Sequence, residues 1–202
     1  MALTRLGTSA YTTLDATKLT GTLPAISGAN LTGIEGISEI DMWVPTADAT
    51  NFTVKGVMDT SSDLLMARHT GANFTKKGTG MSTNNSYWSF PSTGYWYVSL
   101  KGQWRLESTQ SARYVTCRID VSTDGGSSYE ENYGLDQNAV NSASTSSDFC
   151  STDANCVVEV DNISNVKVRG FYISSNANSN LDMAHDDPDQ SCGWTFIKLR
   201  EI

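Results

Sequence analysis

Hydrophobic and polar residues alternate along several stretches of the chain, which is the pattern of β-strands with one buried face. The clearest stretch is 95–106, which follows a turn-forming segment that contains Pro91 and Gly94. Its predicted buried face carries Trp96, Val98, Leu100, Trp104 and Leu106. In 113–121 the corresponding face carries Val115, Cys117, Ile119 and Val121. The Gly-rich segment 122–128 then predicts a hairpin turn that leads into Tyr129.

Similar patterns recur along the rest of the chain from Ser38 onward. Further strands are predicted at 40–44, 51–58, 63–69, 156–160, 166–173 and 193–202. No helix longer than one turn is expected, and about eight to ten short strands separated by turn residues are typical of a β-sandwich. A jelly roll closes such a sandwich without long exposed edges. We therefore predict an all-β jelly-roll head domain over 38–202.

The Gly-rich segment 19–37 has a different pattern, because its large aliphatic residues are three to five positions apart and alternate with Gly, Thr, Ser and Asn. These aliphatic residues are Leu19, Leu23, Ile26, Leu31, Ile34 and Ile37. Gly and Thr disfavour a helix, Pro24 removes a hydrogen-bond donor, and the strict alternation of a strand is absent. The aliphatic side chains therefore need partners from elsewhere.

Two kinds of partner are open: another part of the same chain, or the same segment in neighbouring copies wound about a shared axis. We favour the second, because the strand-rich part of the chain offers no obvious covering element. The segment 19–37 would then be a short, extended, intertwined shaft in an oligomer. Residues 1–18 are polar and offer no core, so they are interpreted as an attachment segment.

Composition narrows the classes of function. The chain has 202 residues, 18% of them charged, and a formal net charge of −8, which argues against a nucleic-acid partner and against anionic lipid surfaces. No apolar run reaches the length of about 18 residues that spans a bilayer. The first residues also lack the hydrophobic core of a secretory signal. Neither membrane insertion nor secretion by the usual route is expected.

The four cysteines do not form a recognisable metal or disulfide framework. Cys117 is in phase with the apolar residues of its strand and is predicted to be a buried thiol. Cys150 and Cys156 could face each other at the end of a hairpin and form a disulfide in oxidising surroundings, with Cys192 as a competing partner. The spacing offers no pair typical of a zinc site.

Catalytic and metal-binding chemistry finds little support in the sequence. The acidic stretch 182–189, which includes His185, lacks the spacing of a calcium loop and is interpreted as a solvated loop. The two histidines, His69 and His185, are not near a recognisable nucleophile. Carboxylates such as Glu107, Glu130, Glu131 and Glu159 leave a polysaccharide hydrolase open as a less favoured alternative. We predict no enzyme, no metal site and no cofactor.

Aromatic residues are more informative, because they can build a core, line a subunit interface or stack on sugar rings. The residues in question are Tyr87, Trp88, Tyr95, Tyr97, Tyr129, Tyr133 and Tyr172. Most of them are expected to be structural. Tyr129 and Tyr133 are the candidate receptor-binding residues, since they lie beside the polar stretch 131–149, which we interpret as a loop.

Two parts of the chain resemble known protein families. The stretch FPSTGYWYVSLKGQW at 90–104 resembles the jelly-roll head of complement component one q and tumour necrosis factor, and TFIKL at 195–199 is similar to the last strand of that family. TDGGSSY and NVKVRGFYI look like counterpart strands in bacteriophage members. LDATKLTGTLPAISGANLTGI at 14–34 resembles the shaft repeats of bacteriophage tail fibres. Together the two resemblances cover nearly the whole chain.

The resemblance implies a homotrimeric virion structural protein, namely a phage tail fibre or fibre tip that attaches the particle to the host surface. Its partners would be other tail or capsid proteins, held through the N-terminal segment, and a glycan or protein on the host. The protein would be assembled in the host cytoplasm and located in the virion. The alternative is a purely architectural component, such as a capsid decoration or a trimerisation cap, without receptor binding.

Overall fold

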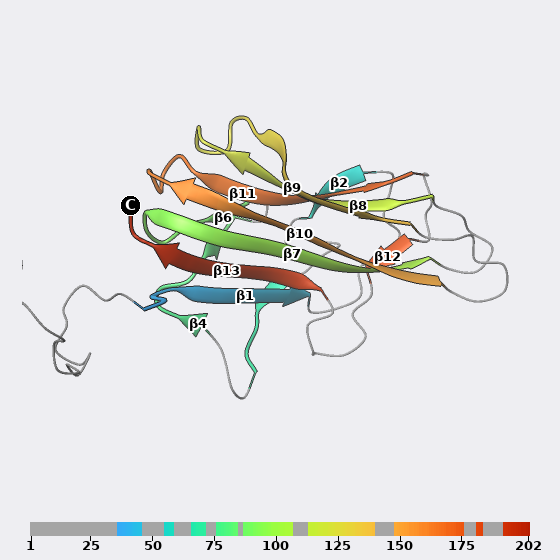
Figure 1. Cartoon of the computed structure of the whole chain (residues 1–202), viewed down its shortest axis with the longest axis horizontal. Helices are drawn as coiled ribbons and strands as arrows, with labels where there is room; N and C mark the ends of the chain where they lie inside the picture. The colour runs from blue at the N-terminus through green and yellow to red at the C-terminus, as the bar shows by residue number, and fades with distance from the viewer. Residues whose placement is uncertain are drawn as a thin grey trace, which may run out of the picture. The chain divides into compact units, whose positions relative to one another are not determined.

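The computed structural model describes residues 36–45, 55–58, 66–71, 76–84, 87–106, 113–139, 148–175, 181–183 and 192–202. All of them belong to one of the two units into which the chain divides, 1–34 and 35–202. The predicted shaft residues Leu19, Leu23, Ile26, Leu31 and Ile34 lie outside the described residues. The regular structure within the described ranges consists entirely of β-strands (Figure 1). These ranges contain no helix that is long and apolar enough to cross a membrane.

The described strands form two antiparallel sheets. The first contains, in spatial order, β10 (Asp148–Val160), β7 (Gly94–Leu106), β13 (Gly193–Arg200), β1 (Ile40–Pro45) and β3 (Met66–Arg68). Two short strands join it, because β12 (Leu181–Met183) pairs with β7 and β4 (Lys76–Lys77) pairs with β1.

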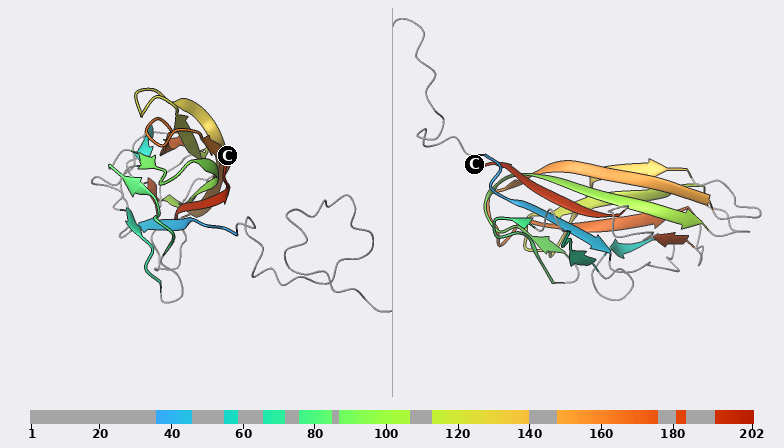
Figure 2. Two further views of the ribbon diagram at one scale, coloured as in Figure 1. Left: turned by 90° about the vertical axis from the view of Figure 1, so that its left-hand side faces the viewer. Right: turned by 90° about the horizontal axis from the view of Figure 1, so that it is seen from below.

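The second sheet contains, in spatial order, β5 (Ser82–Thr83), β6 (Trp88–Ser89), β11 (Lys167–Ser174), β8 (Val115–Ser122) and β9 (Glu130–Asn138). The short strand β2 (Lys55–Met58) pairs with β11 beyond the end of β6. Seen along the strands, the two sheets face each other around the core (Figure 2).

The pairing of eight strands identifies the topology. The first pairs with the last (β1 with β13), and further inward β6 pairs with β11, β7 with β10, and β8 with β9. Such nested antiparallel pairs, distributed over two facing sheets, are the arrangement of a jelly roll. The predicted all-β jelly-roll fold is therefore confirmed. Because β1 and β13 are antiparallel, the chain enters and leaves the sandwich at the same end (Figure 1).

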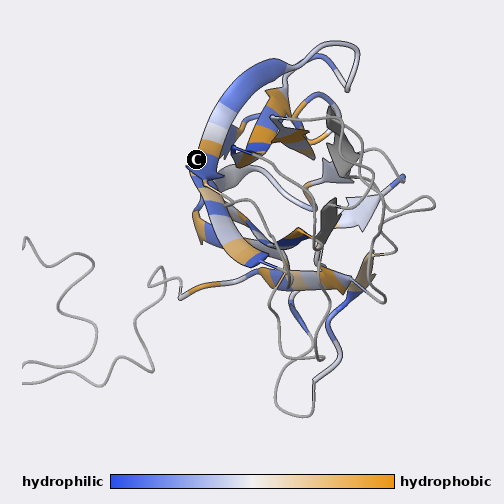
Figure 3. Ribbon diagram, turned by 90° about the vertical axis from the view of Figure 1, so that its right-hand side faces the viewer, coloured by the Kyte–Doolittle hydropathy of each residue, from blue (hydrophilic) through white to orange (hydrophobic). Residues whose placement is uncertain are grey.

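The core lies between the sheets and is built by the inward positions of alternating strands, whose hydropathy alternates along the ribbon (Figure 3). The five residues predicted to face inward on β7 are all fully buried. From the other sheet, the Trp88 ring packs 4.8 Å from that of Trp194, which itself stacks on Phe196 at 5.4 Å. Aromatic side chains of both sheets thus meet in the centre of the core.

The strand β8 departs from simple alternation because it is buried on both faces. Its predicted inward residues, from Val115 to Val121, are buried as expected. The outward residues Thr116, Arg118 and Asp120 are also almost completely buried, since side chains from β9 and β11 contact them. A polar, charged layer therefore covers the outer face of the second sheet at this point.

The interpretation of 131–149 as a loop was wrong at both ends of the stretch. Its first part is the edge strand β9, and its last two residues begin β10. The placement of Cys150 and Cys156 at a hairpin end was wrong for the same reason. Both lie on the single strand β10, six residues and therefore about 20 Å apart. All four cysteines are free thiols.

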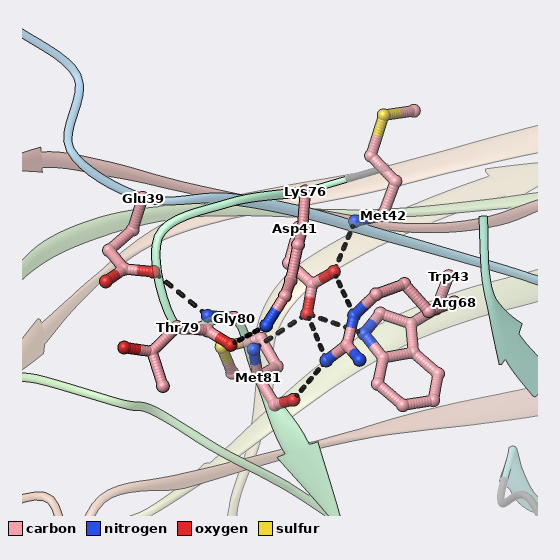
Figure 4. A network of polar contacts seen from close by, with 9 residues as sticks. All are labelled: Glu39, Asp41, Met42, Trp43, Arg68, Lys76, Thr79, Gly80 and Met81. Carbon is pink, nitrogen blue, oxygen red and sulfur yellow. Dashed lines mark hydrogen bonds and ion pairs between the residues drawn. The ribbon is translucent and has the colours of Figure 1, made fainter. Parts of the chain in front are cut away.

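A buried carboxylate anchors the first strand to the rest of the sheet. Asp41 of β1 is 1% exposed and accepts hydrogen bonds from Arg68 Nε and Nη2 at 2.8 and 3.0 Å and from the Met81 amide at 2.7 Å. The indole nitrogen of Trp43 and the amide of Met42 complete its shell (Figure 4). The carboxylate thus joins β1, β3 and the segment before β5.

Candidate functional site

The two candidate receptor-binding tyrosines lie near each other in sequence but face different surroundings. Tyr129 follows the turn between β8 and β9, and its ring lies 3.9 Å from the guanidinium carbon of Arg169 on β11. Tyr133 lies within β9 and is 42% exposed, with Cys156, Glu130 and Glu159 as its electrostatic neighbours. Burial raises the pKa of both hydroxyls. The structure therefore places Tyr129 over β11 and Tyr133 towards the edge of β10.

An ion network surrounds Tyr129 on the outer face of the second sheet. The fully buried carboxylate of Asp120 contacts Arg118 Nε at 2.9 Å and accepts a hydrogen bond from Arg169 Nε at 3.1 Å. The Arg118 guanidinium also lies 4.2 Å from the Phe171 ring and pairs with Glu131 at 3.1 Å. One buried carboxylate thus holds two guanidinium groups, of which Arg118 lies against the Phe171 ring and Arg169 against the Tyr129 ring.

The turn 122–129 holds Tyr129 in position. Asp124 accepts hydrogen bonds from the hydroxyl and the amide of Ser128 at 2.6 and 2.9 Å and from the Ser122 hydroxyl at 2.8 Å. These bonds, led by the one from the Ser128 hydroxyl, lower the pKa of Asp124 to about 2. The carboxylate is therefore ionised at neutral pH and closes the turn.

Gly126 lies between Tyr129 and a second tyrosine, Tyr87. Its φ is +96°, and a Cβ atom there would lie 3.1 Å from Tyr87 Cε1 and 3.2 Å from the Tyr129 hydroxyl. Beside them, Lys167 Nζ lies 5.8 Å from the Tyr87 ring and donates to the Ile163 carbonyl at 2.7 Å. Burial lowers the pKa of this lysine. Tyr87 and Tyr129 therefore converge next to the cationic residues of β11.

Sequence reasoning missed the charged members of this site. The alternation along 166–173 placed Lys167 and Arg169 on the face opposite Val166 and Val168, and the structure confirms this. The alternation did not reveal that Arg169 would contact Asp120. That contact depends on the register between β11 and β8, which places the two residues opposite each other. A charged pattern on two strands, Arg-x-Asp and Lys-x-Arg, was the available signal.

A second surface consists of exposed apolar side chains on the two edge strands. Tyr133 and Leu135 belong to β9, and Phe149 and Val157 belong to β10; all four are 42 to 52% exposed. The two strands lie side by side, since the Asp153 amide of β10 donates to the Asp136 carboxylate of β9 at 2.7 Å. One edge of the sandwich thus presents several large apolar groups to solvent.

The apolar character continues from this edge across the outer face of the first sheet. The strand register places Val157 opposite Tyr97, Tyr97 opposite Ile197, and Ile197 opposite Ile40. These four residues form an apolar row across β10, β7, β13 and β1, and each is at least partly exposed. A shallow hollow of about 140 Å³ opens on the same face, with Gly193 and Thr195 among the residues that line it.

Other sequence-predicted residues do not assemble into a site. Ile37, the one shaft residue among those described, is 45% exposed. Glu130, Glu131 and Glu159 are exposed, whereas Glu107 and His185 lie outside the described residues. Within the described ranges no group of three or more His, Cys, Asp and Glu side chains could hold a metal ion. Nothing is described of the side chains of the acidic stretch 182–189.

The solved structures that resemble this chain have low sequence identity to it. No protein-family model matches the chain, and no curated protein matches it. Similar solved structures include two crystal structures of murine APRIL, determined at pH 8.5 and pH 5.0. They are 14% and 13% identical to this chain, with TM-scores of 0.48 and 0.47; each match covers 80% of this chain and 98% of APRIL. The jelly-roll assignment rests on the strand pairing described above.

Proposed function

We propose that this chain is a homotrimeric virion protein, a phage tail fibre or fibre tip whose jelly-roll head attaches the particle to the host surface. The observation that carries the proposal is the set of exposed apolar residues on the β9 and β10 edge, together with the apolar row from Val157 to Ile40. The resemblance of 14–34 to fibre shafts and of 90–104 to trimeric heads supplies the biological setting.

The apolar surface suits a ring of identical copies. The edge of one copy, with Leu135 and Phe149, would pack on the apolar row of the next copy, while Val157 belongs to both parts. A contact between two different patches repeats head to tail and closes into a ring when the rotation allows it. The segment 19–37 would wind about the same axis as a short shaft, and 1–18 would bind another tail or capsid protein.

Light scattering of the purified chain tests self-association. We expect a mass of three times the chain mass of 21.9 kDa. The variants Leu135→Asp and Val157→Asp should dissociate into single chains, because a carboxylate in the contact loses its water without gaining a partner. Ile163→Asp is the matched control, since Ile163 is 43% exposed but lies in the turn before β11. A single-chain mass of the unmodified protein at micromolar concentration would contradict the proposal.

Attachment is tested by the binding of the labelled trimer to host cells. Three equivalent sites on one rigid head, and several heads on one particle, would give an avidity beyond that of any single site. The trimer should therefore bind cells much more tightly than the Val157→Asp variant. The alternative, an architectural cap or capsid decoration, predicts that neither form binds. The hydrolase alternative instead predicts a loss of viscosity when the protein is incubated with host polysaccharide.

A further inference from the structure

The surface around Tyr129 contains an arginine, Arg169, whose hydrogen-bond donors are only partly used. We call Tyr87, Tyr129, Lys167, Arg169 and Phe171 the Arg169 patch. Arg169 is 23% exposed, and its Nε is held by Asp120 while its two terminal nitrogens donate to none of the residues that the structure describes. Its head is fixed between the rings of Tyr129 at 3.9 Å and Phe171 at 5.7 Å. A guanidinium held in this way is preorganised for a planar anion.

The carboxylates nearby do not compete for these donors. Asp120 is fully buried between the two arginines, and Glu131 pairs with Arg118. Asp124 is occupied by the hydroxyls and amides of its own turn. The three carboxylates balance the three cations Arg118, Arg169 and Lys167, so the region has no excess charge for a dianion. A singly charged carboxylate is the better complement.

The side chains of Tyr87 and Tyr129 indicate which class of molecule would bear that carboxylate. The hydroxyls of Tyr87 and Tyr129 donate to none of the described residues, and both rings border Gly126, which has no side chain to cover them. Partly exposed aromatic rings with free hydroxyls suit a polyhydroxylated ring that offers apolar C–H faces and hydrogen-bonding groups. The chain as a whole is acidic, with a net charge of −8. This charge disfavours binding of polyanions such as nucleic acids.

We propose that the Arg169 patch binds a carboxylated saccharide, with the terminal nitrogens of Arg169 on the carboxylate and the rings of Tyr87 and Tyr129 against the sugar. This inference rests on the proposed function, because it names the class of host ligand that the head would recognise. Each trimer would then carry three such sites on the outer face of the second sheet.

Isothermal titration calorimetry of the full chain tests the proposal with two matched probes: a tetramer of galacturonic acid, and the same tetramer with its carboxyl groups reduced to alcohols. The acidic tetramer should bind about tenfold more tightly or better, because only it can form the two-pronged contact with Arg169. Equal affinities, or binding of neither tetramer, would overturn the proposal. Displacement of the tetramer by an equal concentration of inorganic phosphate would overturn the saccharide assignment as well.

Variants assign the binding to the patch. Arg169→Gln should weaken binding of the acidic tetramer about tenfold, and Arg169→Lys should restore only part of the loss because it keeps the charge but not the fork. Arg200→Gln is the matched control: Arg200 lies 4.7 Å from the Tyr95 ring on the other sheet, and binding should be unchanged. If loss of the Asp120 partner unfolds Arg169→Gln, Tyr129→Leu should show the same weakening. An unchanged affinity in a folded patch variant would overturn the assignment.

Light scattering and host-cell binding on the same preparation separate the two proposals. A trimer that attaches to cells but binds neither tetramer overturns only the ligand class. A protein that binds the acidic tetramer but does not attach to cells overturns the proposed function and leaves the Arg169 patch as a saccharide site.

Discussion

Asp41 and Asp120 are carboxylates with almost no exposure, one in each sheet, and each is surrounded by donors from more than one strand. Asp41 faces inward beside Phe196, so the sandwich accommodates it by aiming Arg68 and a backbone amide at it. The Arg68 guanidinium also lies 4.8 Å from the Trp43 ring. A buried charge of this kind is tolerated because a counter-ion and several hydrogen-bond donors surround it in good geometry.

Replacing Asp41 should therefore be costly. Asp41→Asn exchanges one acceptor oxygen for a donor and leaves the Arg68 charge without its counter-ion, so the free energy of unfolding should fall by about 3 kcal/mol. Urea unfolding followed by tryptophan fluorescence measures the change. Glu39→Gln is the control on the same segment, because the new amide oxygen can still accept from the Gly80 amide, and its loss should stay below about 1 kcal/mol. Equal losses in the two variants would contradict this role for Asp41.

At the scale of elements, the edge formed by β9 and β10 depends on close approach of the two strands. Gly134 of β9 is buried, and a Cβ atom there would lie 2.9 Å from the Asn155 carbonyl oxygen of β10. Asp136 and Asn138 then bridge the strands by accepting from the Asp153 amide and donating to the Ser151 carbonyl. The side chains thus satisfy backbone groups that an edge strand would otherwise leave to solvent.

Gly134→Ala tests this approach. The added methyl group should push β9 away from β10 and lower the free energy of unfolding by about 1 to 2 kcal/mol, as overpacking does in well-packed regions. Thermal or urea unfolding gives the difference. Gly36→Ala serves as the control, since a Cβ at Gly36 would meet nothing within 4 Å and should leave the stability unchanged. A Gly134→Ala variant as stable as the original would show that the strands are free to separate.

The same elements show how far the sequence predicts the structure. β7 and β13 were predicted because most of their inward positions carry large apolar residues, so the alternation is visible although Gly102 of β7 and Lys198 of β13 also face inward. β9 (Glu130–Asn138) was not, because only Gly134 of this strand is buried and its sequence shows no alternation of apolar and polar residues. The first half of β10 hid its alternation for another reason: Thr152 and Ala154 face inward with small side chains, and Trp104 of the neighbouring strand fills the space and donates to Thr152 at 2.9 Å. The Arg169 patch likewise depends on strand pairing.

At the scale of the whole molecule, the proposed trimer would couple folding to association. A partner that binds only the folded form stabilises it, and the melting temperature rises as the concentration of the partner rises. In a homotrimer the partner is the protein itself, so the melting temperature should rise with protein concentration. If the chains unfold as they separate, a hundredfold rise in protein concentration adds about 2 kcal/mol per chain. For a chain of this size that corresponds to an increase in melting temperature of about 5 °C.

Calorimetry at protein concentrations about a hundredfold apart should therefore show this increase for the unmodified chain. Val157→Asp should melt at one temperature regardless of concentration, because Val157 is 49% exposed in the single chain and its replacement costs little within one copy. Ile163→Asp should keep the full concentration dependence, since Ile163 lies in the turn between β10 and β11 and is not part of the apolar row. A melting temperature of the unmodified chain that does not move would mean that the apolar edge and row contribute nothing to stability through self-association. Retention of the increase in Val157→Asp would place the contact between copies elsewhere, and the shaft segment 19–37 would then have to hold the three chains together without the head.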